Sequence, residues 1–308
     1  MRAIQLTRFG DPSVLVPVEL PTPVPAPDQA LIDVEVVSIS FVETQIRAGR
    51  PPGPFPLPEP PYVPGNGVGG VISAVGPGAD ENLIGRRVFS TTGGTGGYAS
   101  QAAVNVADIV PIPDELSTAD AVGLATDGRT AVGLFRLAAP VAGEWVLVEA
   151  AAGGLGSLLV QLALGVGARV IGAVGSSAKL GVVNEKAVAV EYGKPGWAER
   201  VRELSGGLDL VFDGVGGEIG AAAAGALKPA GRFVIHGGAG GRMTDPQTVA
   251  GRVLTLRDVR GTVPELARAA LESGVKPLIG STFPLERAAD AHAAIEARTT
   301  VGKTLLIV

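Results

Sequence analysis

A turn of small residues lies between two apolar segments and could bind a phosphate group. Residues 150–156, AAAGGLG, follow the run WVLV at 145–148 and precede LLVQLALG at 158–165. Small side chains let a diphosphate approach the backbone, and the amides and dipole of a following helix meet its charge. The turn matches the fingerprint Gly-x-Gly-x-x-Gly, except that its first Gly is an Ala. A tightly packed turn without a ligand is the alternative for a lone motif of this kind.

Hydroxyl and ammonium groups follow the next apolar segment, ARVIGAV at 168–174. An NAD site places an Asp or Glu at this point to bind the ribose hydroxyls. Here Gly175 has no carboxylate beside it, and Ser176, Ser177 and Lys179 follow instead. Two hydroxyls and a cation suit a 2′-phosphate, so the segment favours NADPH over NADH. The alternative is a Ser that caps a helix, followed by a solvated Lys.

Alternating strands and helices must position these residues. Strands are predicted at 145–150, 168–174, 187–192, 209–215 and 231–238, and helices at 155–165, 177–185, 198–206 and 217–227. This alternation is typical of βαβ units, and the nearly all-apolar strands indicate a parallel sheet buried on both faces. The additional βα units after the glycine-rich turn strengthen the nucleotide interpretation.

The first third of the chain has a different pattern, in which short strands alternate with turns. We predict these strands at 2–8, 14–20, 30–40, 68–75, 86–91 and 98–105. Residues 51–64, PPGPFPLPEPPYVP, form a proline-rich loop, which is either a stiff surface connection or the rim of a pocket. Residues 114–138 look helical, with Ser117 or Asp120 as N-cap. A helix at 285–298 and a strand at 303–308 end the chain, and we expect them to return to the β-rich domain.

The composition excludes several classes of function. The 308 residues carry a net charge of −5, with 46% hydrophobic residues and no cysteine. A nucleic-acid partner is disfavoured because there is no cluster of Lys and Arg. Disulfides, thiolate nucleophiles and cysteine-containing metal sites are absent. With no signal-peptide core and no membrane-length apolar stretch, a cytoplasmic protein is expected.

Four segments together resemble a known family. They are AAAGGLGSLLVQLA, GGTGGYA at 93–99, PGNGVGGVISAVGPG at 64–78 and RTTVGKTLLIV at the end of the chain. They are similar to the zinc-independent, zeta-crystallin-like quinone oxidoreductases of the medium-chain dehydrogenase/reductase superfamily. The resemblance implies an α/β protein with a GroES-like β-rich catalytic domain (1–115 and 275–308) and a Rossmann-type doubly wound parallel sheet (116–274). It also implies NADPH as cofactor, a quinone or enone as small-molecule substrate, and a homodimer.

The resemblance assigns roles to individual residues. Gly153, Gly154 and Leu155 would contact the diphosphate, and Ser176, Lys179 and Tyr192 the 2′-phosphate. The other positions implied to lie at the cofactor are Thr130, Val215, Gly216, His236, Gly237, Gly238 and Arg298. For Thr130 a bond to its own helix is the alternative, and for Arg298 an interaction with a helix dipole.

The metal and substrate positions depart from the pattern of related proteins. Gly65-Asn66-Gly67 aligns with the Gly-His-Glu ligand segment of zinc alcohol dehydrogenases, and two isolated histidines, His236 and His292, do not make a zinc site. Ser40 replaces an Asn and Gln45 a pocket Tyr, so hydrogen-bonding groups remain but the aromatic face is lost. A segment after Thr262 is shorter than in relatives.

These features lead to a working hypothesis. It is hydride transfer from NADPH to a quinone or another α,β-unsaturated carbonyl, with Ser40, Gln45 or water polarising the acceptor and with no general acid identified. The alternatives are an enoyl or alkenal double-bond reductase and a non-catalytic NADPH-binding sensor or structural protein.

Overall fold

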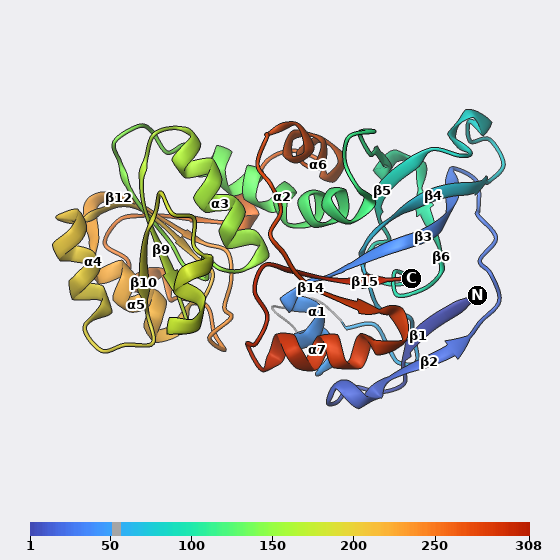
Figure 1. The fold of residues 1–308 in the computed structure, drawn as a ribbon, viewed down its shortest axis with the longest axis horizontal. Coiled ribbons are helices and arrows are strands. Elements are labelled where there is room, and N and C mark those ends of the chain that lie inside the picture. The colour runs from blue at the N-terminus through green and yellow to red at the C-terminus, as the bar shows by residue number, and fades with distance from the viewer. Residues whose placement is uncertain (51–56) are drawn as a thin grey trace. The chain divides into compact units, whose positions relative to one another are not determined.

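The computed structural model describes residues 1–50 and 57–308. Part of the predicted proline-rich loop, residues 51–56, lies outside the described residues. The chain divides into two compact units: unit 1 comprises Met1–Thr126, Val263–Glu272 and Lys276–Val308, and unit 2 comprises Asp127–Thr262 and Ser273–Val275. Helix α2 (Thr118–Ala138) contains the boundary between them (Figure 1).

Unit 1 is built around a largely antiparallel sheet with the strand order β14-β15-β3-β4-β5-β7, to which β6 adds by pairing with β3. The strands of the unit are β1 (Arg2–Leu6), β2 (Leu15–Glu19), β3 (Gln29–Ile39), β4 (Gly67–Val75), β5 (Arg87–Thr91), β6 (Gln101–Asn105), β7 (Val110–Pro111), β14 (Ile279–Pro284) and β15 (Lys303–Ile307). Alternating burial along β3 shows why it is a strand, since its apolar side chains enter the core. The expected β-rich organisation is therefore present.

Unit 1 also contains the first part of α2, up to Thr126, and the helices α1 (Phe41–Arg47), α6 (Val263–Glu272) and α7 (Ala288–Glu296). Helix α7 packs on α1, on β14 and β15, and on a 3-10 turn at Pro12–Val14. The core of the unit joins residues of β1, β3 and β4 to Ala288 and Ala291 of α7. The closing strand β15 pairs antiparallel with β3, so the end of the chain lies in the same sheet as residues 36–39.

Unit 2 is a six-stranded parallel sheet with the order β10-β9-β8-β11-β12-β13 in the described part of the chain. Its strands are β8 (Trp145–Val148), β9 (Arg169–Val174), β10 (Val188–Glu191), β11 (Leu208–Asp213), β12 (Leu227–Ile235) and β13 (Arg252–Thr255). The strand order reverses at the neighbours β8 and β11, as in a doubly wound sheet. This confirms the predicted parallel sheet.

Helices cover both faces of this sheet. Helix α3 (Gly154–Gly165) contacts β8 and β9, whereas α4 (Trp197–Ser205) and α5 (Gly217–Gly225) share a core with the other face (Figure 1). The central residues Val146, Leu147 and Val148 have no exposed surface, which is why β8 is apolar at successive positions.

One predicted helix of unit 2 is wrong. The sequence pattern predicts a helix over residues 177–185, but the chain makes a 3-10 turn at Ser177–Val182 only. Gly181 and the β-branched pair Val182 and Val183 oppose a regular helix. Strand β13 and helix α6 are among the elements that the sequence analysis did not predict, although Thr262 and Glu265 have the spacing of a capping box at the start of α6.

Candidate functional site

The glycine-rich turn joins β8 to α3 through a backbone that leaves no room for larger side chains. Ala150 has a φ of 50°, in the left-handed region. A Cβ on Gly156 would lie 2.3 Å from the carbonyl oxygen of Ala150, so only glycine fits there. Gly153 is the N-cap of α3, and it has no side chain that could accept from the first amides of the helix. The first turn of α3 contains no acidic residue. The amide of Gly153 donates to the carbonyl of Ala150 at 2.8 Å. The helix amides that follow, at Gly154 and Leu155, have no side-chain cap, an arrangement suited to an anion.

The polar residues expected at the second strand lie close to one another. Ser176 is the N-cap of the 3-10 turn that follows β9, and its carbonyl accepts a 3.0 Å bond from the amide of Lys179. Tyr192 follows β10, and its amide bonds the carbonyl of Val174 at 2.9 Å. A Cβ on Gly175 would lie 3.1 Å from the Tyr192 hydroxyl, so this hydroxyl lies over Gly175, next to Ser176 in the chain.

A carboxylate missed from the sequence lies at the same edge of the sheet. Glu191 is the last residue of β10, and its Oε2 is 3.1 Å from Lys194 Nζ. A neighbouring carboxylate repels a phosphate, whereas the ion pair with Lys194 offsets part of that charge.

The loops after β11 and β12 pack against each other through their backbones. The amides of His236 and Gly237 donate to the carbonyl of Asp213 at 2.9 and 3.2 Å. Gly216 has a φ of 72°, and a Cβ there would lie 2.2 Å from the carbonyl oxygen of Arg242. A Cβ on Gly238 would lie 2.9 Å from the carbonyl carbon of Arg242. The structure thus brings Gly216, which follows Val215, together with His236, Gly237 and Gly238 at the carboxyl edge of the sheet.

Two buried carboxyl groups under these loops escaped the sequence analysis. Glu149 follows β8 and Asp213 ends β11, and neither has exposed surface. Glu149 Oε2 accepts a 3.1 Å bond from the amide of Val215, and Asp213 Oδ1 a 2.7 Å bond from that of Gly216. The signal was present in VLVEA and LVFDG, where an acid ends an otherwise apolar strand. Burial and the neighbouring charge of Asp213 raise the pKa of Glu149 well above its usual range.

His236 is held neutral in the same region. Its Nε2 atom is buried without a hydrogen-bond partner, and a Cβ on Gly214 would lie 2.8 Å from its Cε1. Burial lowers the pKa of His236 to about 4, although the charge of Asp213 opposes this. A neutral imidazole at the end of β12 cannot supply positive charge at neutral pH.

Two more of the predicted cofactor residues are not part of the strand-end loops. Thr130 is in the interior of α2. Arg298 follows α7, has a φ of 58°, and stacks its guanidinium over the Phe41 ring at 4.6 Å from the centroid. The Phe41 contact gives Arg298 a partner inside unit 1.

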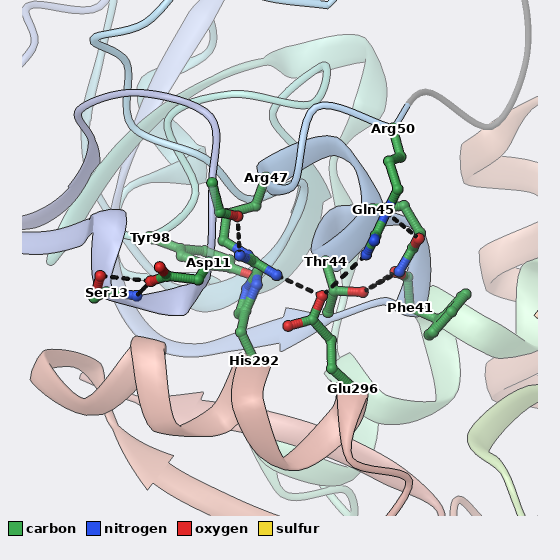
Figure 2. A network of polar contacts seen from close by, with 11 residues as sticks. Asp11, Ser13, Phe41, Thr44, Gln45, Arg47, Arg50, Tyr98, His292 and Glu296 are labelled. Atoms are coloured by element: carbon green, nitrogen blue, oxygen red, sulfur yellow. Dashed lines mark hydrogen bonds and ion pairs between the residues drawn. The ribbon is translucent and has the colours of Figure 1, made fainter. Parts of the chain in front are cut away.

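The predicted substrate residues lie on α1 in unit 1. Ser40 is the N-cap, its amide donates to Glu43 Oε2 at 2.6 Å, and its hydroxyl is 3.4 Å from Lys303 Nζ. Gln45 donates to the hydroxyl of Thr44 at 3.1 Å and accepts from Arg50 Nε at 3.1 Å (Figure 2). Both side chains are partly exposed. They retain hydrogen-bonding capacity, with Gln45 held by its neighbours.

Comparison with known proteins identifies the family. Residues 26–114 match the model of the alcohol dehydrogenase GroES-like domain, and residues 185–306 match that of the zinc-binding dehydrogenase. The quinone oxidoreductase of Mus musculus is 32% identical over 100% of this chain and 98% of its own length. The chain belongs to the quinone oxidoreductase family. The expected zinc-independent branch of the medium-chain dehydrogenases/reductases and the GroES-like domain are thereby confirmed.

Other similar proteins extend the comparison. The 2-haloacrylate reductase of a Burkholderia species is 30% identical over 99% of this chain and 98% of its own. The crystal structure of Escherichia coli quinone oxidoreductase complexed with NADPH has a TM-score of 0.90, with 27% identity and full coverage of both chains. A mycobacterial protein complexed with NADPH has a TM-score of 0.88 and 31% identity, also over both full chains.

This quinone oxidoreductase family member differs from zinc dehydrogenases at the expected metal position. A Cβ on Gly67 would lie 2.5 Å from the hydroxyl of Ser38 and 2.7 Å from that of Thr126, so a carboxylate has no space here. His292 is buried, with Nε2 2.9 Å from the Tyr98 hydroxyl. Over residues 1–50 and 57–308, no group of three or more His, Cys, Asp or Glu could hold a metal ion. No helix in the same ranges is long and apolar enough to cross a bilayer.

Proposed function

We propose that this chain is an NADPH-dependent oxidoreductase that delivers hydride to a quinone or another α,β-unsaturated carbonyl. The observation that carries the proposal is the edge of the parallel sheet. There α3 begins without a side-chain cap and the Tyr192 hydroxyl lies over Gly175, which supports binding of a dinucleotide with an extra phosphate. Two of the similar solved structures are complexed with NADPH, which supports the same cofactor.

The residues present fit this cofactor. Gly153, Gly154 and Leu155 would hold the diphosphate through their backbone, since α3 begins there without a side-chain cap or an acid. Ser176, Lys179 and Tyr192 would hold the 2′-phosphate with two hydroxyls and an ammonium group. When bound, NADPH supplies a hydride at C4 of the nicotinamide.

The chain's own residues would position the reactants and exclude water. Val215, Gly216, His236, Gly237 and Gly238 are our candidates for the ribose and nicotinamide side, with Thr130 and Arg298 as further contacts. Ser40 and Gln45 are our candidates for a hydrogen bond to the acceptor carbonyl, which would stabilise negative charge developing on its oxygen. We assign no general acid.

The direct test follows the oxidation of NADPH by its absorbance, with a panel of quinones and 2-enals as acceptors. Turnover of quinones supports the proposal. Tight NADPH binding with no turnover of any acceptor would contradict it. Binding is measured separately by calorimetry, so a failure of chemistry is distinguished from a failure of binding.

A double-bond reductase is the second candidate. The similarity to a 2-haloacrylate reductase favours it, because 2-haloacrylate contains a carbon–carbon double bond conjugated to a carboxylate. Product analysis after incubation with a 2-enal separates the two activities, because a saturated aldehyde indicates reduction of the carbon–carbon double bond. A non-catalytic role is disfavoured, since the relatives above are named enzymes. The cytoplasmic location and the homodimer stay predictions.

A further inference from the structure

One pair of carboxyl groups connects the three loops that we assign to the cofactor. Glu149 directly precedes the glycine-rich turn and accepts from the amide of Val215 in the loop after β11. Asp213 accepts from the amide of Gly216 through its side chain and from that of His236 through its carbonyl. The position of each loop therefore depends on these two residues.

The pair is buried and lacks a compensating cation. Glu149 and Asp213 have no exposed surface, and Glu149 Oε1 and Asp213 Oδ2 each lack an N–H or O–H donor. The groups near them within the described residues include the neutral His236, the hydroxyl of the buried Thr244 and the backbone amides named above. Two adjacent buried carboxylates cannot both stay ionised at low cost, so the pair retains a proton that one oxygen donates to the other.

We propose that Glu149 is a positioning residue for the cofactor: its carboxyl group, protonated and donating to Asp213, fixes the loops that carry Val215, Gly216 and His236. Loss of that proton places two negative charges side by side under the loops, and the repulsion displaces the amides from the cofactor. The inference rests on the proposed function, because these loops are its cofactor loops.

The decisive variant is Glu149→Gln. An amide at this position donates to Asp213 and accepts from the amide of Val215 at every pH, so it imitates the protonated acid. We expect the dissociation constant of NADPH for the wild type to rise as the pH passes upward through the folded pKa of Glu149, by about tenfold for each pH unit above it, the effect of one coupled proton. For Glu149→Gln the dissociation constant stays within about twofold over the same pH range, after correction by the control.

The control is Glu218→Gln, the same change at an exposed position in the first turn of α5. Glu218→Gln reports any effect of pH on NADPH itself and on the other residues that bind it. We expect its dissociation constant for NADPH to follow the wild-type pH profile. If Glu149 had a purely structural role, Glu149→Gln would bind NADPH more weakly than the wild type by the same factor at every pH. That result, or a wild-type profile parallel to that of Glu149→Gln, overturns the proposal.

Stability of the cofactor-free protein gives an independent readout. Because the pKa of Glu149 is raised in the folded state, the folded protein binds more protons than the unfolded chain above the ordinary value of 4.5. The wild type therefore loses stability relative to Glu149→Gln as the pH rises from 4.5 through the folded pKa. A difference in urea midpoint that does not change with pH overturns the proposal, whether or not NADPH binds.

If Glu149→Gln does not fold, a second variant takes its place. Asp213→Asn also removes one of the two charges while its amide donates to Glu149, and it should bind NADPH with little pH dependence. If NADPH binds neither the wild type nor any variant, the proposed function fails, and the urea comparison still decides whether the proton is shared.

Discussion

The buried guanidinium of Arg47 forms a 2.5 Å ion pair with Glu296, which joins the end of α1 to the end of α7 (Figure 2). The Arg47 side chain is 2% exposed and that of Glu296 25% exposed. Arg47 also donates to the carbonyl of Gly10, while its Nε has no partner. A single side chain thus connects α1, which carries the candidate residue Gln45, to the end of α7.

Removing the carboxylate should therefore destabilise unit 1. Glu296→Gln leaves the buried charge of Arg47 without its counter-ion, and we expect a loss of about 3 kcal/mol, the lower end for a broken buried pair because Glu296 is partly exposed. Urea unfolding measures it. The control is Glu203→Gln, which breaks the exposed pair with Arg200 and should cost under about 1 kcal/mol. Equal costs would mean that the Arg47 pair contributes no more than a surface contact.

His292, beside the same pair, should make the protein sensitive to acid. Burial, with a smaller effect of the Arg47 charge, lowers the pKa of His292 from 6.5 to about 3. Below pH 6.5 the unfolded chain binds a proton at His292 that the folded protein does not. The free energy of unfolding therefore falls as the pH drops from 6.5 towards about 3. The wild type should lose stability relative to His292→Gln by about 1.4 kcal/mol per pH unit in that window.

Tyr98→Phe is the matched variant for this measurement. It removes the hydroxyl that lies 2.9 Å from His292 Nε2 but keeps the imidazole, so its unfolding free energy should follow the wild-type pH profile with a constant offset. A His292→Gln difference that is constant between neutral and acidic pH would show that His292 does not remain neutral in the folded protein.

The glycine-rich turn was predictable because its signal is local. Small residues, an apolar strand before them and an apolar helix after them are all contiguous in the sequence, and β8, Gly153 and α3 are where the pattern placed them. The segment around Lys179 shows the limit of local patterns. Apolar spacing favours a helix there, and the backbone cost of Gly181 and the β-branched residues prevails.

The carboxyl pair was not predictable from any one segment. Glu149 and Asp213 are far apart in the sequence and meet because β8 and β11 are neighbours in the sheet. The two strands are neighbours because a crossover connection reverses the strand order between them. The periodicity of apolar residues within a strand does not predict that connection. The contact of Arg47 with Glu296 is of the same kind, since it depends on the packing of α7 against α1.

Gly220 of α5 should tolerate no methyl group. A Cβ there would lie 1.9 Å from the hydroxyl of the buried Thr244 and about 3 Å from both carboxylate oxygens of Asp213. Gly220→Ala should therefore destabilise the protein by about 1–3 kcal/mol in urea unfolding, although alanine normally stabilises a helix. Gly165→Ala is the control, because a Cβ at the end of α3 meets nothing within 4 Å and should stabilise by up to about 1 kcal/mol. A stabilising Gly220→Ala would contradict the packing of α5 on Asp213.

Lys179 should determine the choice between the two nicotinamide cofactors. Its ammonium group is our candidate partner for the 2′-phosphate, which NADH lacks, together with Ser176 and Tyr192. Lys179→Ala should weaken NADPH binding by ~1.5–3 kcal/mol, typical of a lost charged hydrogen bond, and leave NADH nearly unchanged. Calorimetric titration with both cofactors measures this. Lys186→Ala, at an exposed position beyond the 3-10 turn, controls for the general loss of positive charge. Equal losses for NADPH and NADH would place the 2′-phosphate away from Lys179, and the absence of a carboxylate after β9 would then need a different explanation.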